Sequence, residues 1–384
     1  MHRRQFLALT ASALAASPVW AKGRGDGKWA RSFGDYVRAG LATAETPGMG
    51  VAIVDGGGTQ FSAGYGYADV ARARRVTPDT VFQIASVSKT VTATAMMMLW
   101  QDGAFRLDDA IAPLLDFPLA HPKFPGVPVT FRHLFTHTSG ISDAVYYTLD
   151  FTGKTPPPLR EFLRDYLAPG GKYYDPAKSW SDAKPGTAWD YCNVAVALLG
   201  YLAGRVNPDP LDVFTRTRLF APLGLKHTSW RYEGVAAGDL ADPYEFADAH
   251  YRALPRQSYP DWPAGLLCTS ANDYARTLSI YTDGGRVNGR AYLKPDTIAT
   301  MLTPDAVLPD KDHPDLRQGL TWFLSGKDGR RIALHSGGDP GAASLAAFDV
   351  DRHVGALAFA NITPAKPIVV FQKQAVKRML DRDL

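Results

Sequence analysis

Residues 82–101 read Phe82-Gln-Ile-Ala-Ser-Val-Ser-Lys-Thr-Val-Thr-Ala-Thr-Ala-Met-Met-Met-Leu-Trp-Gln101. The apolar run from Val87 to Gln101 predicts a buried helix, and Ser86 stands at its start. Lys89 then lies one turn along the same face, where its amine can approach the serine hydroxyl. A hydroxyl becomes a good nucleophile when a neighbouring base takes its proton, and free N–H groups at a helix start stabilise negative charge. The segment predicts a nucleophilic serine, with an N-cap serine and a surface lysine as the simpler alternative.

The same Ser-x-x-Lys pattern occurs a second time, from Ser181 to Lys184. About one such match is expected by chance in a chain of this length, so the pattern alone is weak. The second copy lies in the turn-rich segment 178–186, where no helix fixes the lysine beside the serine. We therefore expect Ser86, and not Ser181, to be the reactive serine.

Apolar periodicity outside this helix predicts strands at both ends of the chain and helices between them. A mixed α+β fold follows: an antiparallel sheet flanked by the terminal helices, with an inserted all-helical region. We expect an α/β part at about 29–85 and 315–384 and a helical part at about 86–314. The expected helices are Trp29 to Thr43, Val87 to Gln101, Leu159 to Tyr166, Asn193 to Gly204, Leu211 to Phe220, Ala271 to Tyr281 and Ile368 to Leu380. The expected strands are Gly48 to Val54, Gln60 to Tyr67, Gly319 to Leu324, Arg330 to His335, Ala343 to Phe348 and Val354 to Ala360.

Composition and charge restrict the class of protein. The chain has 384 residues, of which 46% are hydrophobic and 21% charged, as in globular proteins. The formal net charge of +4 is too small for a nucleic-acid-binding surface, so we expect no nucleic-acid partner. A structural or adhesion protein would need repeated or long hydrophobic surfaces, and the sequence contains no such repeat.

The N-terminus has the pattern of an export signal. A basic start with Arg3 and Arg4 precedes a short apolar stretch and small residues ending at Ala21. The paired arginines resemble a twin-arginine signal, so residues 1–21 are interpreted as a cleaved signal peptide and 22–384 as the mature domain. The apolar stretch is shorter than the roughly 20 residues that span a bilayer. We expect a periplasmic protein with no stable membrane span after cleavage.

Other reactive patterns are missing or incomplete. The sequence has no Gly-x-Ser-x-Gly and no Gly-x-x-x-x-Gly-Lys loop. His133 and His137 have helical i, i+4 spacing but lack the glutamate of a metalloprotease, which favours a structural pair over a metal site. Cys192 and Cys268 could form a disulfide in an oxidising compartment, and the sequence alone does not decide this. No cofactor or metal is expected.

Two further motifs follow Ser86 in order. Tyr191-Cys-Asn193 is the one Tyr-x-Asn in a chain with 17 tyrosines, and it opens an apolar helix. His335-Ser-Gly337-Gly338 ends a predicted strand. Together with Ser86-x-x-Lys89, these motifs resemble those of the penicillin-binding protein and class C β-lactamase superfamily of serine hydrolases. The supporting segments are Leu107-Asp-Asp109, Val129-Thr-Phe-Arg-His-Leu-Phe-Thr-His-Thr-Ser-Gly140, Pro185-Gly186, Pro222-Leu-Gly224 and Asn361, and the likeness covers roughly residues 35–362.

The resemblance implies a β-lactamase/transpeptidase-like fold, with 22–384 as the serine hydrolase domain, and a role for each matching residue. Ser86 would form the acyl-enzyme, Lys89 would lower the proton affinity of the serine, and Tyr191 would act as general base. Asn193 would bind an amide or ester oxygen of the substrate, and the N–H groups of Ser86 and Gly338 would form the oxyanion hole. By the same resemblance, the strand motif His335, Ser336, Gly337 and Gly338 would line the substrate site.

His335 departs from the Lys-Thr-Gly found in many family members. A histidine with an ordinary pKa near 6.5 is mostly neutral at pH 7, so a permanent cationic anchor for a carboxylate is lost. The substrate is therefore left open among an ester, a D-amino-acid peptide and a β-lactam. The alternative function is a penicillin-binding protein homologue that acylates with little or no turnover. We expect the loops from Tyr146 to Trp180 and from Tyr232 to Trp262 to wall the cleft; the oligomeric state is not predicted.

Overall fold

The computed structural model describes residues 27–56, 58–151, 154–308, 314–326 and 329–382. Its centre is a nine-stranded antiparallel sheet in these residues, with the strand order β10-β11-β12-β13-β14-β15-β1-β2-β3. The strands are β10 (Ala306–Val307), β11 (Leu316–Gln318), β12 (Phe323–Ser325), β13 (Ile332–Asp339), β14 (Ala342–Asp349), β15 (Val354–Ala360), β1 (Gly48–Asp55), β2 (Gly58–Asp69) and β3 (Arg74–Arg75). The predicted signal peptide lies outside the described residues.

The sheet joins the two ends of the chain. Strand β15 pairs with β14 on one edge and with β1 on the other, with Met49 opposite Ala360 and Val54 opposite Gly355. All residues of β14 and β15 are buried, because helices cover both faces of the sheet at this point. The expectation of one sheet built from both termini is thus confirmed.

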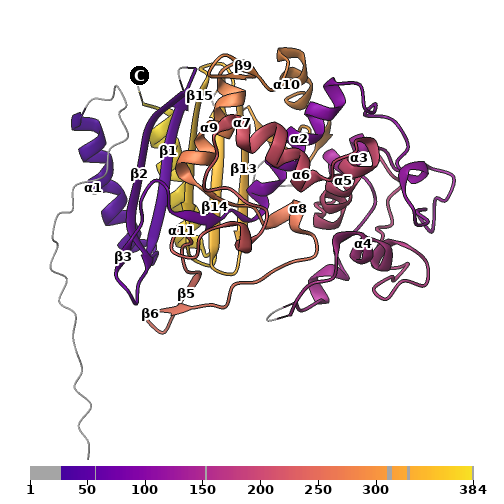
Figure 1. Cartoon of the computed structure of the whole chain (residues 1–384), viewed down its shortest axis with the longest axis horizontal. Coiled ribbons are helices and arrows are strands. Elements are labelled where there is room, and N and C mark those ends of the chain that lie inside the picture. Colours follow the sequence, from indigo (N-terminus) through magenta and orange to yellow (C-terminus); the bar gives the residue numbers. More distant parts are fainter. Residues whose placement is uncertain (1–26, 57, 152–153, 309–313, 327–328, 383–384) are drawn as a thin grey trace, which may run out of the picture.

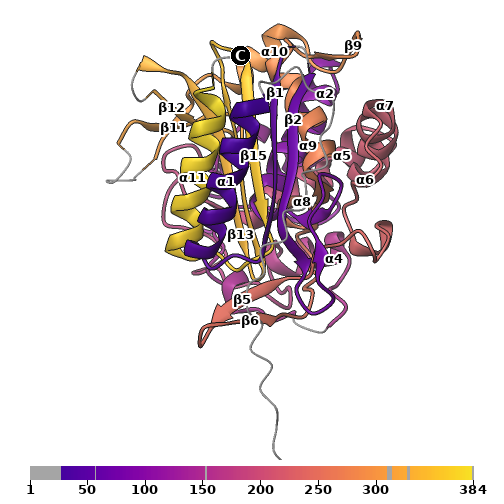
Figure 2. The same ribbon diagram turned by 90° about the vertical axis from the view of Figure 1, so that its left-hand side faces the viewer.

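The terminal helices α1 (Gly27–Thr43) and α11 (Lys366–Leu380) lie side by side on one face of the sheet (Figure 2). The apolar side chains of α1 repeat at helical spacing, from Phe33 to Val37 to Leu41, and they are buried. Gly40 lets α11 approach, since a Cβ there would lie 2.0 Å from the ring of Phe371. The sequence placed these helices over the faces of the sheet, but the structure places both on the same face.

The opposite face is covered by α9 (Ala271–Thr282) and by the rest of the helical region (Figure 1). The other helices are α2 (Ser88–Gln101), α3 (Phe131–Phe135), α4 (Leu159–Leu167), α5 (Asn193–Val206), α6 (Leu211–Thr215), α7 (Ala221–Leu223), α8 (Trp262–Gly265) and α10 (Pro295–Met301). All residues of α2 from Ser88 to Leu99 are buried, which agrees with apolar residues on every side of this helix. None of the described helices is long and apolar enough to cross a bilayer.

Most predicted elements agree with the structure within three residues, with three corrections. The predicted strand from Gly319 to Leu324 is wrong, because Gly319 N–H donates to Trp322 O at 2.9 Å in a turn between β11 and β12. The predicted helix from Leu211 to Phe220 changes to a π-helical turn at Arg216. The inserted region is not purely helical, since it contains two two-stranded ladders and one strand of a third. The ladders within it pair β5 (Tyr244–Ala247) with β6 (His250–Ala253) and β8 (Arg286–Val287) with β9 (Arg290–Ala291). Its strand β7 (Cys268–Ser270) pairs with β4 (Val81–Gln83), which precedes Ser86.

Candidate active site

Ser86 lies in the short 3-10 turn η1 (Ala85–Val87), which leads into α2. The preceding Ala85 has φ = +44°, a left-handed conformation that costs an alanine about 1 kcal/mol. The turn is held from two sides: Ile84 N–H donates to Leu267 O at 2.9 Å, and Ser344 Oγ donates to Ile84 O at 2.6 Å. The serine is thus presented at a strained and tightly held start of the buried helix.

Lys89 is fully buried and makes three hydrogen bonds. Its Nζ lies 2.9 Å from Ser86 Oγ, 2.7 Å from Asn193 Oδ1 and 2.8 Å from Ala264 O. An ammonium has three N–H donors, so all of them find an acceptor. Of the three partners only the serine can also donate. The same contact therefore allows an ammonium to stabilise the Ser86 alkoxide or a neutral amine to accept the serine proton.

Asn193 opens α5 and is held by a carboxylate that the sequence reasoning did not identify. Asp143 is 3% exposed and accepts from Asn193 N at 2.6 Å, Asn193 Nδ2 at 2.8 Å and Val194 N at 3.1 Å. It also accepts from Cys192 Sγ at 3.0 Å. The Asn193 Nδ2 group has a second contact with the hydroxyl of Tyr147 at 3.3 Å. Asp143 therefore serves as a cap for the first turn of α5.

Tyr191 lies against Lys89, whose Nζ is 4.9 Å from the centre of the phenol ring. On its other side the ring of His137 packs at 4.5 Å between centroids. His137 also fixes the backbone here, because Nδ1 accepts from Cys192 N at 3.2 Å and its carbonyl accepts from Asp190 N at 2.8 Å. Burial and the nearby Lys89 ammonium hold the pKa of His137 well below its usual value. The structure thus gives His137 a place beside the site, separate from His133, whose ring caps α3.

Strand β13 forms the wall opposite Ser86. A Cβ on Gly337 would lie 2.8 Å from Ser86 N and 2.6 Å from Ile84 O, so the strand packs directly on the serine turn. Ser336 and Gly338 are exposed beside it. His335 is 0% exposed, and burial together with the Lys89 ammonium lowers its pKa to about 3. The ring is therefore neutral at physiological pH, and its contact with a substrate stays a prediction.

Two aspartates lie near Lys89 on the side of α8. Asp261 is 4% exposed and accepts from the hydroxyl of Tyr146 at 2.9 Å, while Asp339 accepts from Gln83 Nε2 at 3.1 Å. Burial raises the pKa of Asp261 to about 6. Burial and the Asp261 carboxylate raise the pKa of Asp339 to about 7. The site thus combines one buried cation with acidic groups that titrate near neutral pH.

Both cysteines are free and buried. Cys192 lies between Tyr191 and Asn193, and its Sγ accepts from Ala195 N at 3.3 Å. Burial, followed by the Asp143 carboxylate, raises the pKa of this thiol well above its usual value. Cys192 therefore has a packing role next to the site.

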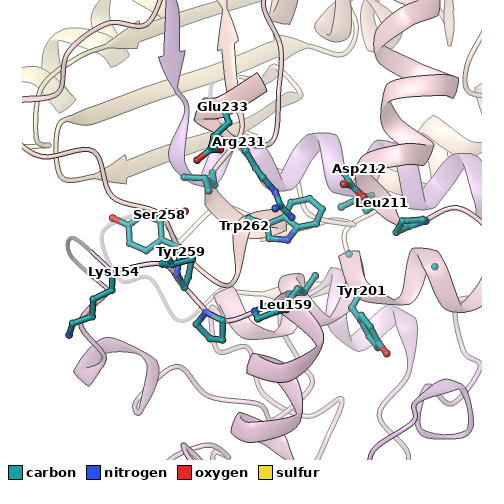
Figure 3. Close-up of a pocket in the computed structure, with 18 of the residues that line it drawn as sticks. Lys154, Leu159, Tyr201, Leu211, Asp212, Arg231, Glu233, Ser258, Tyr259 and Trp262 are labelled. Atoms are coloured by element: carbon teal, nitrogen blue, oxygen red, sulfur yellow. The ribbon is translucent and has the colours of Figure 1, made fainter. Parts of the chain in front are cut away.

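A pocket of about 960 Å³ is lined in part by Trp262 of α8, the helix whose Ala264 carbonyl accepts from Lys89 (Figure 3). Trp262 and Tyr259 line it together with Leu159 and Arg231, and none of the predicted site residues belongs to its lining. Residues of both predicted cleft loops contribute to this pocket, and Tyr147 of the first loop also contacts Asn193. No group of three or more His, Cys, Asp or Glu side chains is arranged to hold a metal ion within the described ranges.

Comparison with known proteins gives one family. The model of the family described as Beta-lactamase matches residues 33–377. Penicillin-binding protein 4 of Amycolatopsis lactamdurans is 32% identical over 266 residues, which cover 69% of this chain and 61% of that protein. The matched regions span 45% to 61% of the first curated relatives, so those proteins extend well beyond the matched part.

Solved structures share the fold at low sequence identity. The octameric penicillin-binding protein homologue from Pyrococcus abyssi superposes with a TM-score of 0.76 at 23% identity, covering 92% of this chain and 78% of that one. The D-amino acid amidase from Ochrobactrum anthropi SV3, complexed with L-phenylalanine amide, has a TM-score of 0.74 at 21% identity, covering 92% of this chain and 98% of that one. At these identities the likeness concerns the fold.

Proposed function

The chain belongs to the Beta-lactamase family, and on that premise we propose that it is a serine hydrolase that cleaves a carboxylic ester or amide through an acyl-enzyme on Ser86. The single observation that carries this proposal is the 2.9 Å contact between Lys89 Nζ and Ser86 Oγ at the strained start of α2. A buried lysine beside a serine hydroxyl is what nucleophilic activation requires.

The proposed reaction has two steps. Ser86 Oγ attacks the acyl carbon while its proton passes to the phenolate oxygen of Tyr191, which must be deprotonated to act as the base. The N–H groups of Ser86 and Gly338 stabilise the oxyanion. The leaving alcohol or amine takes that proton as the bond to the acyl carbon breaks. Water then attacks the acyl-enzyme, gives its proton to the same base and releases the acid, and Ser86 regains a proton. Lys89 lowers the proton affinity of Ser86 throughout.

Asn193 is proposed to bind the substrate through Nδ2. One hydrogen of this group is held by Asp143, whereas the other is directed at Tyr147, which is 69% exposed. A substrate amide or ester oxygen would take the place of the tyrosine hydroxyl. His335 contributes no positive charge to this site, which favours substrates that do not depend on a carboxylate anchor.

A second candidate is acylation with little or no turnover. It is favoured by the resemblance to a relative named as a penicillin-binding protein. The two candidates share Ser86 chemistry and differ in the second step. They are separated by the ratio of the acyl-enzyme formed to the product released.

We also propose that residues 1–21 direct export to the periplasm, by the twin-arginine route, and that 22–384 form the hydrolase domain. Within that domain the α/β part at about 29–85 and 315–384 would hold the helical part at about 86–314. The paired Arg3 and Arg4 support the first proposal, and the position of Ser86 at the boundary supports the second.

The test is hydrolysis of a short-chain nitrophenyl ester by residues 22–384, comparing wild type with Ser86→Ala and Ser181→Ala. We expect turnover to fall at least about 1,000-fold in Ser86→Ala and to stay within about twofold in Ser181→Ala. Turnover that survives in Ser86→Ala would show that the nucleophile is wrong. A burst of one equivalent without further product would favour the second candidate.

A further inference from the structure

Asp143 is a buried carboxylate that the proposed chemistry does not use. It lies in the loop after α3 and is 3% exposed, and its carboxylate accepts hydrogen bonds from Cys192, Asn193 and Val194, in the segment that carries Tyr191. A cap for α5 would need only the two backbone N–H groups of Asn193 and Val194. The additional bond to Asn193 Nδ2 concerns the side chain that contacts Lys89.

This bond decides which way the Asn193 amide points. A carboxylate accepts hydrogen bonds and donates none, so the NH₂ group of Asn193 must face Asp143. The oxygen Oδ1 must then face Lys89, where it accepts from Nζ at 2.7 Å. In the opposite orientation two N–H groups would face the ammonium, and Lys89 would lose one of its three acceptors.

The same bond links two opposite charges. Lys89 is 0% exposed, and Asn193 is the one residue that joins it by hydrogen bonds to the Asp143 carboxylate. A buried cation is costly unless it is paired and hydrogen-bonded. Asn193 lies between the Asp143 carboxylate and Lys89. Asp143 therefore supplies a negative charge without taking the N–H group of Lys89 that bonds Ser86.

We propose that Asp143 is a positioning residue for the acylation step, which orients the Asn193 amide toward Lys89 and balances the charge of the buried ammonium. This inference rests on the proposed function of Ser86. Among the described residues, the other titratable or charged groups that face this cluster are Tyr147, Tyr166, Asp190, Tyr191, Cys192, His137, Asp261, His335 and Asp339.

The test variant is Asp143→Asn, which keeps the shape and an oxygen that can cap α5. Its NH₂ group no longer forces the orientation of Asn193, and the negative charge is gone. We expect kcat/KM for the nitrophenyl ester to fall about 10- to 100-fold. Because loss of a negative charge favours the deprotonated form of every neighbour, the whole pH profile of kcat/KM should move to lower pH by about one unit.

The matched control is Asp273→Asn. Asp273 is 1% exposed and likewise accepts from a backbone N–H and a side chain, His227 N at 2.6 Å and Thr228 Oγ1 at 3.0 Å. We expect Asp273→Asn to lower the melting temperature by about as much as Asp143→Asn does, without shifting the pH profile of kcat/KM. An Asp143→Asn enzyme whose rate loss comes without a displaced profile would reduce Asp143 to a helix cap and overturn the proposal.

A second pair of variants covers poor folding of Asp143→Asn. Asn193→Asp alone places two carboxylates against each other, whereas Asp143→Asn with Asn193→Asp restores one donor and one acceptor. We expect kcat/KM of the double variant to be at least about tenfold higher than the value obtained by multiplying the effects of the two single variants. Independent effects would overturn the proposal.

Labelling of Ser86 by a fluorophosphonate, followed by mass spectrometry, separates this inference from the proposed function. Wild type that is not labelled at Ser86 would refute both. Wild type that is labelled, with Asp143→Asn and Asp273→Asn labelled equally fast, would refute the role of Asp143 alone. We expect Asp143→Asn to be labelled about 10- to 100-fold more slowly than Asp273→Asn.

Discussion

The chain contains the same four-residue pattern in two regions, with opposite outcomes. Lys89 is buried, hydrogen-bonded to its serine and surrounded by fixed acceptors, whereas Lys184 is exposed. Ser181 Oγ accepts from Ala183 N–H at 3.3 Å, a local turn contact. Serine and lysine three residues apart thus become a reactive pair only where a helix orders them and the surrounding core removes water.

The largest expected effect comes from removing each lysine in turn. Lys89→Met should lower kcat/KM about 1,000-fold or more, because Ser86 Oγ loses its hydrogen bond with Lys89 Nζ. Lys184→Met should change the rate less than about twofold and the unfolding free energy by less than about 0.5 kcal/mol. Ester hydrolysis and denaturant unfolding of both variants test this. Equal rate losses would erase the contrast between the two regions.

The next effect concerns strand β13, which packs on the turn of Ser86 through Gly337. In Gly337→Ala the new Cβ would meet two backbone atoms of the serine turn at 2.6 and 2.8 Å, so the turn or the strand must shift. We expect a loss of about 100-fold in kcat/KM and of about 1 to 3 kcal/mol in unfolding free energy. Gly126→Ala, where a Cβ meets nothing within 4 Å, is the control. A fully active Gly337→Ala enzyme would mean that Ser86 tolerates movement of this wall.

A third contrast is the response of stability to pH. His335 stays neutral in the folded protein down to about pH 3, but it takes up a proton near pH 6.5 when unfolded. Its contribution is therefore constant above pH 6.5 and is lost as the pH falls toward 3. When the pH is lowered from 7.5 to 5, the unfolding free energy of wild type should fall by about 2 kcal/mol more than that of His335→Gln. His250→Gln, at an exposed position, should follow wild type in urea unfolding at both pH values. Parallel curves for His335→Gln would contradict the burial of a neutral ring.

The smallest effect is expected at the alanines beside the two serines. Ala85→Gly relieves left-handed strain of about 1 kcal/mol. It also removes a buried methyl worth about 0.8 kcal/mol and gives the unfolded chain the freedom of a glycine, about 0.4 to 1 kcal/mol, so a net loss below about 1 kcal/mol is expected. Ala183→Gly has no such relief and should cost about 0.5 to 1 kcal/mol. Thermal unfolding of both variants gives the comparison. A loss above about 1 kcal/mol in Ala85→Gly would show that the turn is not strained.

The sequence predicted those parts of the molecule that depend on local pattern. Helix α2, the helix after Asn193 and the paired terminal strands follow from apolar periodicity, and the structure brings Ser86, Lys89 and Asn193 together as the ordered motifs indicated. Asp143 and the carbonyl of Ala264 were not predicted, because their roles depend on contacts between distant segments. The segment from Val129 to Gly140 supports the family resemblance and so points to this loop. Nothing in it marks the carboxylate of Asp143, three residues later, as a partner of Asn193. The turn at Gly319 was missed because its apolar residues face the core, as Trp322 does.

Strand β15 has a consequence for the order of events during synthesis. It lies between β14 and β1, so the sheet stays in two pieces until residue 360 has left the ribosome. A nascent chain that ends before β13 can hold Ser86 and Lys89 on one helix. It lacks strand β13, which carries Gly337, and strands β14 and β15, which join β13 to β1. Contacts between residues about 300 positions apart form slowly because a long loop must close first. Folding to the state that holds the complete site is therefore expected to wait until β15 has been synthesised.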